Sequence, residues 1–430
     1  MRTLLGKTLE ELKEIALELS LPAFTAKQIA DWLYKKRVTS IDKMTNLSKS
    51  ARERLSKEFV IGIDQTLQVV TSQDGTRKYL FKPQSTAEQQ STAGQQSTAK
   101  QQSTSERQSA AEQQCTAGPQ PAIGDQRTAG QQSTTVQQST AGRQSAAERQ
   151  STAEQPGCAS GSIESVIIPD NERKTICVSS QVGCKMACTF CMTGRQGFHG
   201  NLSVASILSQ FIAVEESQEL TNAVFMGMGE PLDNLENVML AIEVLTADWG
   251  FAWSPKRITL STIGVTTQLG GRGIVWKGVE YKNVNPLKFF LDNCKVHLAV
   301  SLHNPFYEER LALMPAERTF PLEKSLKLIK EYDFTGQRRV SFEYTMFNKV
   351  NDSKRHADRL AQLLRGLECR VNLIRFHSIP DSPLESSPMQ VIEHFRERLQ
   401  ASGITATIRA SRGEDILAAC GMLSGKGNNL

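Results

Sequence analysis

The sequence predicts an α/β fold: a parallel sheet closed partly or fully into a (β/α) barrel, preceded by a small helical domain and interrupted by a repeat insertion. Three observations support this. From Ser162 onward, short apolar strands alternate with helical stretches, an order typical of parallel sheets with helical crossovers. Residues 1–62 show mainly helical periodicity. Between these parts large apolar residues almost vanish, and a period of six residues takes over.

Composition limits the class of protein only loosely. A chain of 430 residues with a net charge of +5 allows two or three domains and permits an RNA partner without requiring one. Nine cysteines in a chain this long do not suggest a secreted disulfide framework. Met1–Ser20 reads as an amphipathic helix without a signal pattern, and no apolar run approaches the ~18 residues of a membrane span. We therefore expect a cytoplasmic protein with no membrane contact.

Residues 1–62 form the predicted helical domain. Three amphipathic segments lie within Thr8–Glu58, and Pro22 ends the first of them. Thr25 is the expected N-cap of the second segment. Many Lys and Arg residues occur here, which suits either a solvated face or an accessory RNA-binding domain. Residues 63–83 then predict a β-hairpin around the Asp74–Gly75 turn.

Residues 84–157 form a low-complexity insertion built on hexapeptides such as QQSTAE and QQSTAG. We expect it to be disordered, because it offers too little apolar surface to offset chain entropy. A β-helix would need an apolar position in every turn, which the repeat lacks. Cys115 and Cys158, in or beside the repeat, have no expected catalytic role.

Residues 158–430 form the predicted barrel with a C-terminal catalytic segment. Its expected strands are residues 164–169, 175–180, 222–227, 257–262, 296–302, 338–347 and 369–376. Its expected helices are Val204–Ser217, Leu235–Ala247, Leu322–Glu331, Lys354–Leu367 and Met389–Ser402. In such folds the functional residues gather at the carboxyl ends of the strands.

Cys184, Cys188 and Cys191 follow the second expected strand in a CxxxCxxC pattern. Three thiolates at this spacing suit a [4Fe–4S] cluster with one iron left open for a cofactor. Structural zinc would need a fourth ligand, usually from a second CxxC pair, and the sequence has none. Cys294 and Cys369 have the default interpretation of small buried side chains.

The sequence motifs around these cysteines resemble those of a known family. CVSSQVGC, MTGRQGFHGNL, FMGMGEPL, LSTIG, AVSLH and GEDILAACGML occur in this order. CxxxCxxC resembles the radical S-adenosylmethionine (SAM) superfamily, and the whole set resembles its RlmN-type RNA adenine C2-methyltransferases. The resemblance covers nearly the whole chain except the insertion. It implies that the barrel is incomplete, a partial (β/α) barrel of the radical SAM type.

The resemblance implies a SAM site at the strand ends. Gly229 and Glu230 would contact the SAM amino group, and Ser261, Ser301, Leu302 and His303 would bind its ribose and carboxylate. His377 stands where the family has an Asn, and a histidine can still make one such hydrogen bond. Without the resemblance, Glu230 would lie in an ordinary strand-to-helix turn and His303 would be a buried, satisfied histidine.

The resemblance also implies three catalytic residues, Cys420, Cys177 and Glu164. One SAM would methylate Cys420, and a second, bound to the open iron, would give a 5′-deoxyadenosyl radical that takes a hydrogen from this methyl group. The carbon radical would add to C2 of adenine. Cys177 would then release the product by forming a disulfide with Cys420. Glu164 would accept the C2 proton, although its strand alone suggests a solvent-facing residue.

The expected substrates are a 23S ribosomal RNA adenosine and the adenosine 3′ of the anticodon in some tRNAs. The expected partner is a flavodoxin- or ferredoxin-type electron donor, and we expect a monomer. Three alternatives remain open: a Cfr-type enzyme acting at C8 of the same adenine, a radical SAM enzyme acting on a peptide or small molecule, and a cluster- or zinc-bearing RNA-binding protein without catalysis.

Overall fold

The computed structural model describes residues 1–84, 161–267, 273–336 and 338–425. The predicted insertion, with Cys115, lies almost wholly outside the described residues, and so does Cys158 beside it. Within the described ranges, no helix is long and apolar enough to cross a membrane.

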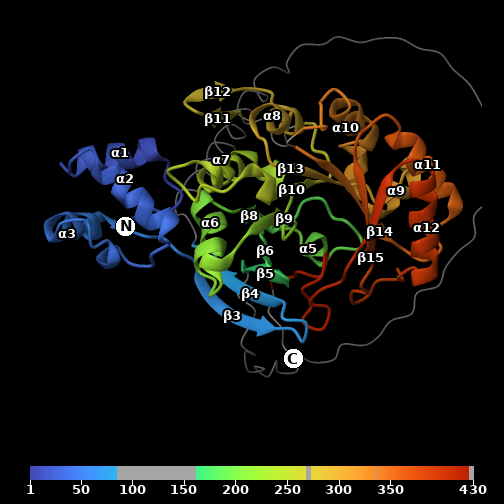
Figure 1. Ribbon diagram of the computed structural model, residues 1–430, viewed down its shortest axis with the longest axis horizontal. Coiled ribbons are helices and arrows are strands. Elements are labelled where there is room, and N and C mark those ends of the chain that lie inside the picture. Colours follow the sequence, from blue (N-terminus) through green and yellow to red (C-terminus); the bar gives the residue numbers. More distant parts are fainter. Residues whose placement is uncertain (85–160, 268–272, 337, 426–430) are drawn as a thin grey trace, which may run out of the picture. The chain divides into compact units, whose positions relative to one another are not determined.

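A ten-stranded sheet forms the centre of the fold (Figure 1). Its strand order is β16-β15-β14-β13-β10-β9-β6-β5-β4-β3. Neighbours from β6 to β16 run parallel, and β5, β4 and β3 continue the sheet with antiparallel pairing. The order ends at β16 and β3, which confirms the predicted partial barrel.

The sheet strands are β3 (Gln65–Thr71), β4 (Arg77–Lys82), β5 (Ile163–Asp170), β6 (Arg173–Cys177), β9 (Asn222–Phe225), β10 (Ile258–Thr262), β13 (His297–Ser301), β14 (Val340–Met346), β15 (Arg370–Arg375) and β16 (Thr405–Arg409). Two small pairs stand apart from this sheet: β7 (Gln181–Gly183) with β8 (Phe198–Asn201), and β11 (Ile274–Trp276) with β12 (Val279–Tyr281). β16 and both small pairs were not predicted, because each is short and polar or glycine-flanked.

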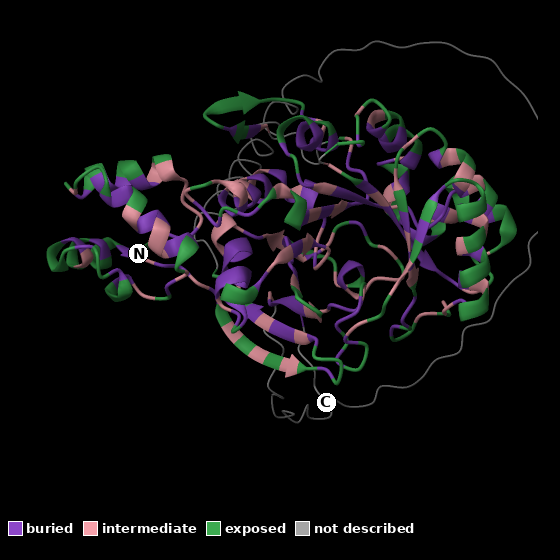
Figure 2. Cartoon of the chain, viewed as in Figure 1, coloured by how far each residue is buried: buried purple, intermediate pink, exposed green. Residues whose placement is uncertain are grey.

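The helices between the strands lie on the outside of the curved sheet (Figure 1). They are α6 (Val204–Ile212), α7 (Leu235–Thr246), α8 (Pro286–Asn293), α9 (Tyr307–Leu313), α10 (Leu322–Ile329), α11 (Lys354–Leu364) and α12 (Met389–Ala401). The short helix α5 (Met192–Arg195) instead lies within the curve of the sheet (Figure 1). Buried residues line the space between sheet and helices (Figure 2). Strand β14 is buried along almost its whole length, as expected for a parallel strand covered on both faces.

The N-terminal part contains α1 (Leu9–Glu18), α2 (Thr25–Ala30) and α3 (Lys49–Glu58), with β1 (Arg2–Thr3) paired to β2 (Phe59–Val60). Thr8 caps α1 in a reciprocal capping box with Glu11. The predicted cap at Thr25 is wrong. Phe24 takes the cap position without a side-chain bond, because the turn after Pro22 begins the helix one residue earlier and buries Thr25.

Arg37 ties this helical part to the barrel. Its guanidinium lies 4.6 Å from the centre of the Phe251 ring and donates to the Ser217 carbonyl. Burial lowers the pKa of Arg37 to about 10. Arg37 therefore anchors the helical part to the barrel and is not a solvated surface charge.

Candidate active site

The cysteine loop begins where β6 ends. The amides of Ser180 and Gln181 both donate to the Met228 carbonyl, at 2.8 and 3.1 Å, so the loop is fastened to the end of neighbouring β9. The Cys184 amide donates to the Gly197 carbonyl at 2.9 Å. Gly194 packs against the loop so closely that a Cβ there would lie 2.9 Å from the Cys188 nitrogen. The loop is thus fixed largely by its own backbone.

The three predicted cluster cysteines line one cavity of about 150 Å³. Burial is the main cause that raises the pKa of the Cys184 thiol to about 12, and it also raises the pKa values of Cys188 and Cys191. The charge of Cys191 raises the pKa of both Cys184 and Cys188 further. Three thiolates in one desolvated loop repel one another, so a cationic group is needed to keep them deprotonated.

The three thiols suit an iron–sulfur cluster as a donor set. Within the described ranges, no three His, Cys, Asp or Glu side chains converge closely enough to hold a single ion. In a [4Fe–4S] cluster each cysteine binds a different iron, so the thiolates stand farther apart than the ligands of one zinc. The donor set therefore fits the cluster.

Five of the predicted SAM residues line the same cavity: Gly229, Glu230, Ser261, Ser301 and His303. Two others do not. Leu302 is fully buried outside its lining. His377 lines a second cavity instead, where it contacts Ser411 Oγ at 2.9 Å and Glu414 Oε1 at 3.1 Å.

Glu230 is the buried carboxylate of the first cavity. Its Oε1 accepts from the Leu232 amide and its Oε2 from the Ile263 amide, both at 3.0 Å. Burial raises the pKa of Glu230 to about 7. A cationic amine beside this carboxylate would favour its ionised form. Gly229 has φ +100°, and a Cβ there would lie 2.5 Å from Gln181 Cβ, so only glycine fits this turn.

His303 is held as a neutral imidazole. Its Nδ1 accepts from the Thr345 amide at 3.0 Å, so the proton of the neutral ring is on Nε2. Burial lowers the pKa of His303 to about 3, and nearby Arg310 lowers it further. The ring can therefore offer a hydrogen-bond donor to a ligand carboxylate or hydroxyl.

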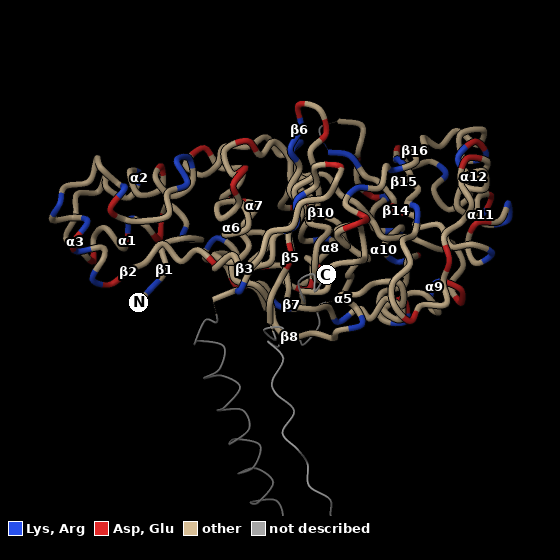
Figure 3. Tube along the Cα trace, turned by 90° about the horizontal axis from the view of Figure 1, so that it is seen from below, with Lys and Arg blue, Asp and Glu red and all other residues tan. Residues whose placement is uncertain are grey.

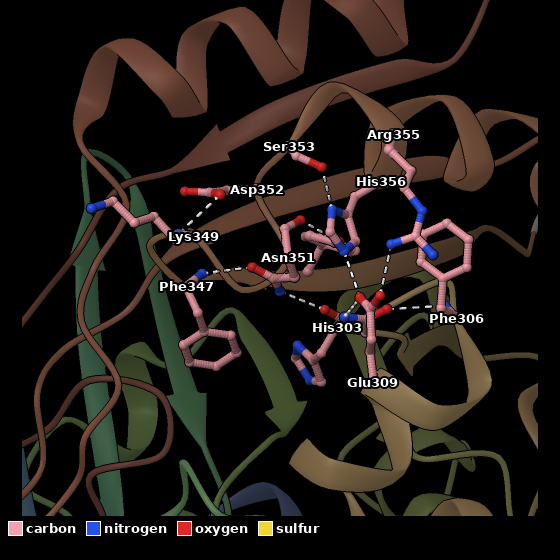
Figure 4. Close-up of polar contacts among 12 residues, drawn as sticks. His303, Phe306, Glu309, Phe347, Lys349, Asn351, Asp352, Ser353, Arg355 and His356 are labelled. Atoms are coloured by element: carbon pink, nitrogen blue, oxygen red, sulfur yellow. Dashed lines mark hydrogen bonds and ion pairs between the residues drawn. The ribbon is translucent and has the colours of Figure 1, made fainter.

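Asn351 holds the backbone of His303 in place (Figure 4). Its amide nitrogen donates to the His303 and Thr345 carbonyls at 2.6 and 2.7 Å, and its amide oxygen accepts from the Phe347 amide at 2.7 Å. His303 has φ +55°, a left-handed conformation that a histidine rarely adopts. Asn351 offsets this strain. No sequence motif indicated it, because its role depends on bringing two distant loops together.

A second cavity, of about 320 Å³, contains both predicted catalytic cysteines. Burial raises the pKa of Cys177 to about 12, and Cys420 raises it further while Arg409 lowers it. Cys420 is exposed and lines both cavities, as do Cys191 and Arg409. The two cavities therefore meet at Cys420.

Arg409, at the end of β16, is the cation at this junction. The charge of Cys420 is the main cause that raises the pKa of Arg409, followed by Glu343, whose carboxylate lies 4.0 Å away. From the sequence, Arg409 and Arg412 could either hold RNA phosphates or the base, or form surface salt bridges. The strand that positions Arg409 was not recognised.

Glu164 differs from the solvent-facing residue that its strand alone suggested. It is fully buried, ion-paired to Lys78 at 3.2 Å, and lines neither cavity. Its position within β5 is covered because the C-terminal residues Ser424 and Gly425 pack onto it.

Comparisons with known proteins agree with this arrangement. Residues 2–61 match the ribosomal RNA large subunit methyltransferase N-terminal domain, and residues 178–361 match the radical SAM superfamily. A radical SAM methyltransferase from Sphaerobacter thermophilus superposes with a TM-score of 0.73 and 30% identity, covering 99% of this chain and 100% of that one.

Relatives match over nearly the full length. "Probable dual-specificity RNA methyltransferase RlmN" of Parabacteroides distasonis is 46% identical over 98% of this chain and 96% of its own. The Porphyromonas gingivalis protein of the same name is 44% identical over 98% and 96%. "Dual-specificity RNA methyltransferase RlmN" of Syntrophus aciditrophicus is 34% identical over 97% and 95%. Radical SAM proteins use a [4Fe–4S] cluster and SAM, which the first cavity fits. The chain belongs to the RlmN family of radical SAM RNA methyltransferases.

Proposed function

We propose that this protein methylates C2 of a specific adenosine in 23S ribosomal RNA, and of the adenosine 3′ of the anticodon in some tRNAs, through an S-methyl group on Cys420. One observation supports this most directly: Cys420 lies where the cavity of the three cysteines meets the cavity that contains Cys177. A methyl carrier needs that position, because it must face a cofactor first and a substrate base second.

In this proposal Cys184, Cys188 and Cys191 hold the cluster, and Glu230, Ser261, Ser301 and His303 orient SAM. The Cys420 thiolate attacks the methyl group of one SAM, and S-adenosylhomocysteine leaves. The cluster and a second SAM supply the electron and the adenosyl radical that removes one hydrogen atom from this methyl group. The carbon radical on Cys420 then adds to C2 of the adenine.

Release restores the aromatic ring and frees the enzyme. The adduct must lose one electron, for which the bound cluster would be the acceptor, and its C2 proton, for which we propose Glu164 as acceptor. The Cys177 thiolate then attacks the Cys420 sulfur, the C–S electron pair passes to the product carbon, and a solvent proton completes the methyl group. An external dithiol reduces the Cys177–Cys420 disulfide before the next turnover.

The test is mass spectrometry of Cys177→Ala enzyme co-expressed with its native RNA. We expect RNA covalently bound to Cys420, because the resolving thiolate is missing. Cys294→Ala, a buried cysteine outside both cavities, is the matched control and should carry no adduct. A fully active Cys177→Ala enzyme without adduct would contradict the release chemistry. Digested wild-type RNA should contain 2-methyladenosine, and 8-methyladenosine as the main product would contradict the C2 assignment.

We further propose that residues 1–62 form an accessory RNA-binding domain. Lys27, Lys35 and Lys36 are exposed on it, and Figure 3 shows Lys and Arg along its helices. Replacing these three lysines by Glu should weaken RNA binding and reduce its salt dependence, measured by titration at several salt concentrations. Unchanged affinity would refute the role. Arg37 is left intact, since it anchors the domain.

A further inference from the structure

The Cys420 segment, Gly413–Gly425, is fastened at its start to the β3–β4 turn. Asp74 Oδ2 accepts from the Gly413 amide at 2.9 Å. Asp415 accepts from Ser72 Oγ at 2.5 Å and from the Gln73 amide at 3.1 Å. These contacts lie several residues before Cys420, so they leave the placement of the thiol itself to other groups.

Helix α5 supplies some of those groups: the Met192 amide donates to the Gly421 carbonyl at 2.8 Å, and Thr193 Oγ1 donates to the Leu423 carbonyl at 2.7 Å. A buried ion pair beneath the segment supplies others. Lys78 Nζ lies 3.2 Å from Glu164 Oε1, with side chains only 4% and 1% exposed. Strands β4 and β5 pair Lys78 with Val166 and Leu80 with Glu164. Lys78 and Glu164 are therefore diagonal neighbours on one face of the sheet.

Both members of this pair reach the backbone of the Cys420 segment. Lys78 Nζ donates to the Leu417 carbonyl at 3.3 Å, before Cys420. Glu164 Oε2 accepts from the Ser424 and Gly425 amides at 2.6 and 3.0 Å, after Cys420. A Cβ on Gly425, which has φ +62°, would lie 2.5 Å from the Ser162 carbonyl, so the segment approaches β5 as closely as its backbone permits.

Burial makes these contacts mutually dependent. A buried ion pair is stable only when its remaining donors and acceptors are also satisfied. Here the backbone of the segment supplies one acceptor for Lys78 before Cys420 and two donors for Glu164 after it. Removing either charge would leave the other buried and uncompensated, and would weaken both attachments together.

We infer that Lys78 is a positioning residue: through its ion pair with Glu164 it holds Leu417 and Ser424–Gly425, and thereby places Cys420 where the two cavities meet. This inference rests on the proposed role of Cys420. It also links two events of that proposal. While the segment is docked, the Glu164 carboxylate is occupied by backbone amides, and departure of the segment frees it to accept a proton.

The test is Lys78→Met in the full-length enzyme, followed by hydrogen–deuterium exchange and intact-protein mass spectrometry. We expect the Ser424 and Gly425 amides to exchange about tenfold faster or more, because a buried partner has been lost. The fraction of enzyme isolated with methylated Cys420 should fall several-fold. Lys78→Arg should largely restore both. Lys82→Met, on the exposed end of the same strand, should leave both unchanged. Wild-type exchange and methylation in Lys78→Met would overturn the inference.

The double variant Lys78→Met/Glu164→Gln carries the test if Lys78→Met does not fold. It has no uncompensated charge, and the new amide oxygen still accepts from Ser424 and Gly425. We expect Gly425 to stay protected while the amides of residues 416–419 exchange about tenfold faster, since the donor to Leu417 is gone. Wild-type exchange at both places would overturn the inference. Unmethylated Cys420 in the wild-type enzyme would instead refute the proposed function. The exchange result would still test whether Lys78 and Glu164 hold the segment.

Discussion

The cysteine loop and the Cys420 segment bring thiols to the same cavity, but they are held there differently. The loop follows β6 directly and is fixed by backbone hydrogen bonds from Ser180, Gln181 and Cys184. The segment follows β16 at one end of the sheet order. Side chains of the remote strands β4 and β5 hold it, together with the Met192 amide and the Thr193 hydroxyl of α5. Cofactor ligands need a rigid place, whereas a thiol that must face two partners needs attachments that can be released.

The largest expected effect concerns the cysteine loop. Cys188→Ser should abolish the iron–sulfur absorbance and reduce RNA methylation by roughly 10³-fold or more, because one iron loses its thiolate. Iron and sulfide analysis of anaerobically purified protein measures the first result. Cys369→Ser, outside both cavities, is the control and should retain both properties. Retained iron in Cys188→Ser would show that the cluster is held elsewhere.

The next effect compares Cys177 with Cys420 through their reactivity. Burial raises the pKa of Cys177 to about 12, so at neutral pH the thiol is protonated and its thiolate fraction rises tenfold per pH unit. Iodoacetamide should therefore modify Cys177 roughly 50-fold more slowly than an ordinary thiol at pH 7, with a rate that climbs steadily from pH 7 to 9. Cys420 is exposed, so its unmethylated fraction should react first. Peptide mass spectrometry under reducing conditions checks this, and equal rates would contradict the burial argument.

A smaller effect concerns the support behind the SAM residues. Asn351→Asp removes both amide donors to the His303 and Thr345 carbonyls and places a carboxylate against them. We expect the KM for SAM to rise about tenfold, and the free energy of unfolding to fall by about 1–3 kcal/mol. Steady-state kinetics and thermal unfolding measure these changes. Asn283→Asp, at an exposed position outside both cavities, is the control and should change neither. An unchanged KM in Asn351→Asp would mean that His303 holds its own conformation.

The sequence predicted the parallel part of the sheet and the motifs at its strand ends well. The order of apolar strands and helices gave the parallel part of the sheet, and the motifs at the strand ends located Cys184, Glu230, Ser261 and His303, which line one cavity. These features depend on local pattern and on the rule that parallel strands carry their functional residues at one end.

What the sequence did not predict depends on contacts between distant segments. Lys78 was counted only as part of a hairpin, and Glu164 looked solvent-facing from its strand, because both are covered by residues more than 250 positions away. His377 matches the family position by alignment, yet the chain turns its side chain into the second cavity. Strand periodicity gives no information about such coverage.

The smallest expected effect on activity concerns the repeat that separates strands β4 and β5, which carry Lys78 and Glu164. Strands β4 and β5 pair as far as Phe81 and Ile163, and Asp64 accepts from the Gln84 amide at 3.0 Å. Joining Gln84 directly to Gly161 would leave a loop of about five residues, a length that antiparallel hairpins tolerate. If the repeat contributes only chain length, shortening the loop about 16-fold should stabilise the fold by about 2 kcal/mol. RNA methylation should stay within about twofold of wild type, because Lys78 and Glu164 keep their register. Loss of methylation with normal unfolding would show that the repeat takes part in RNA binding. Loss of the fold would show that β4 and β5 need the repeat in order to pair, and with it the attachment of the Cys420 segment.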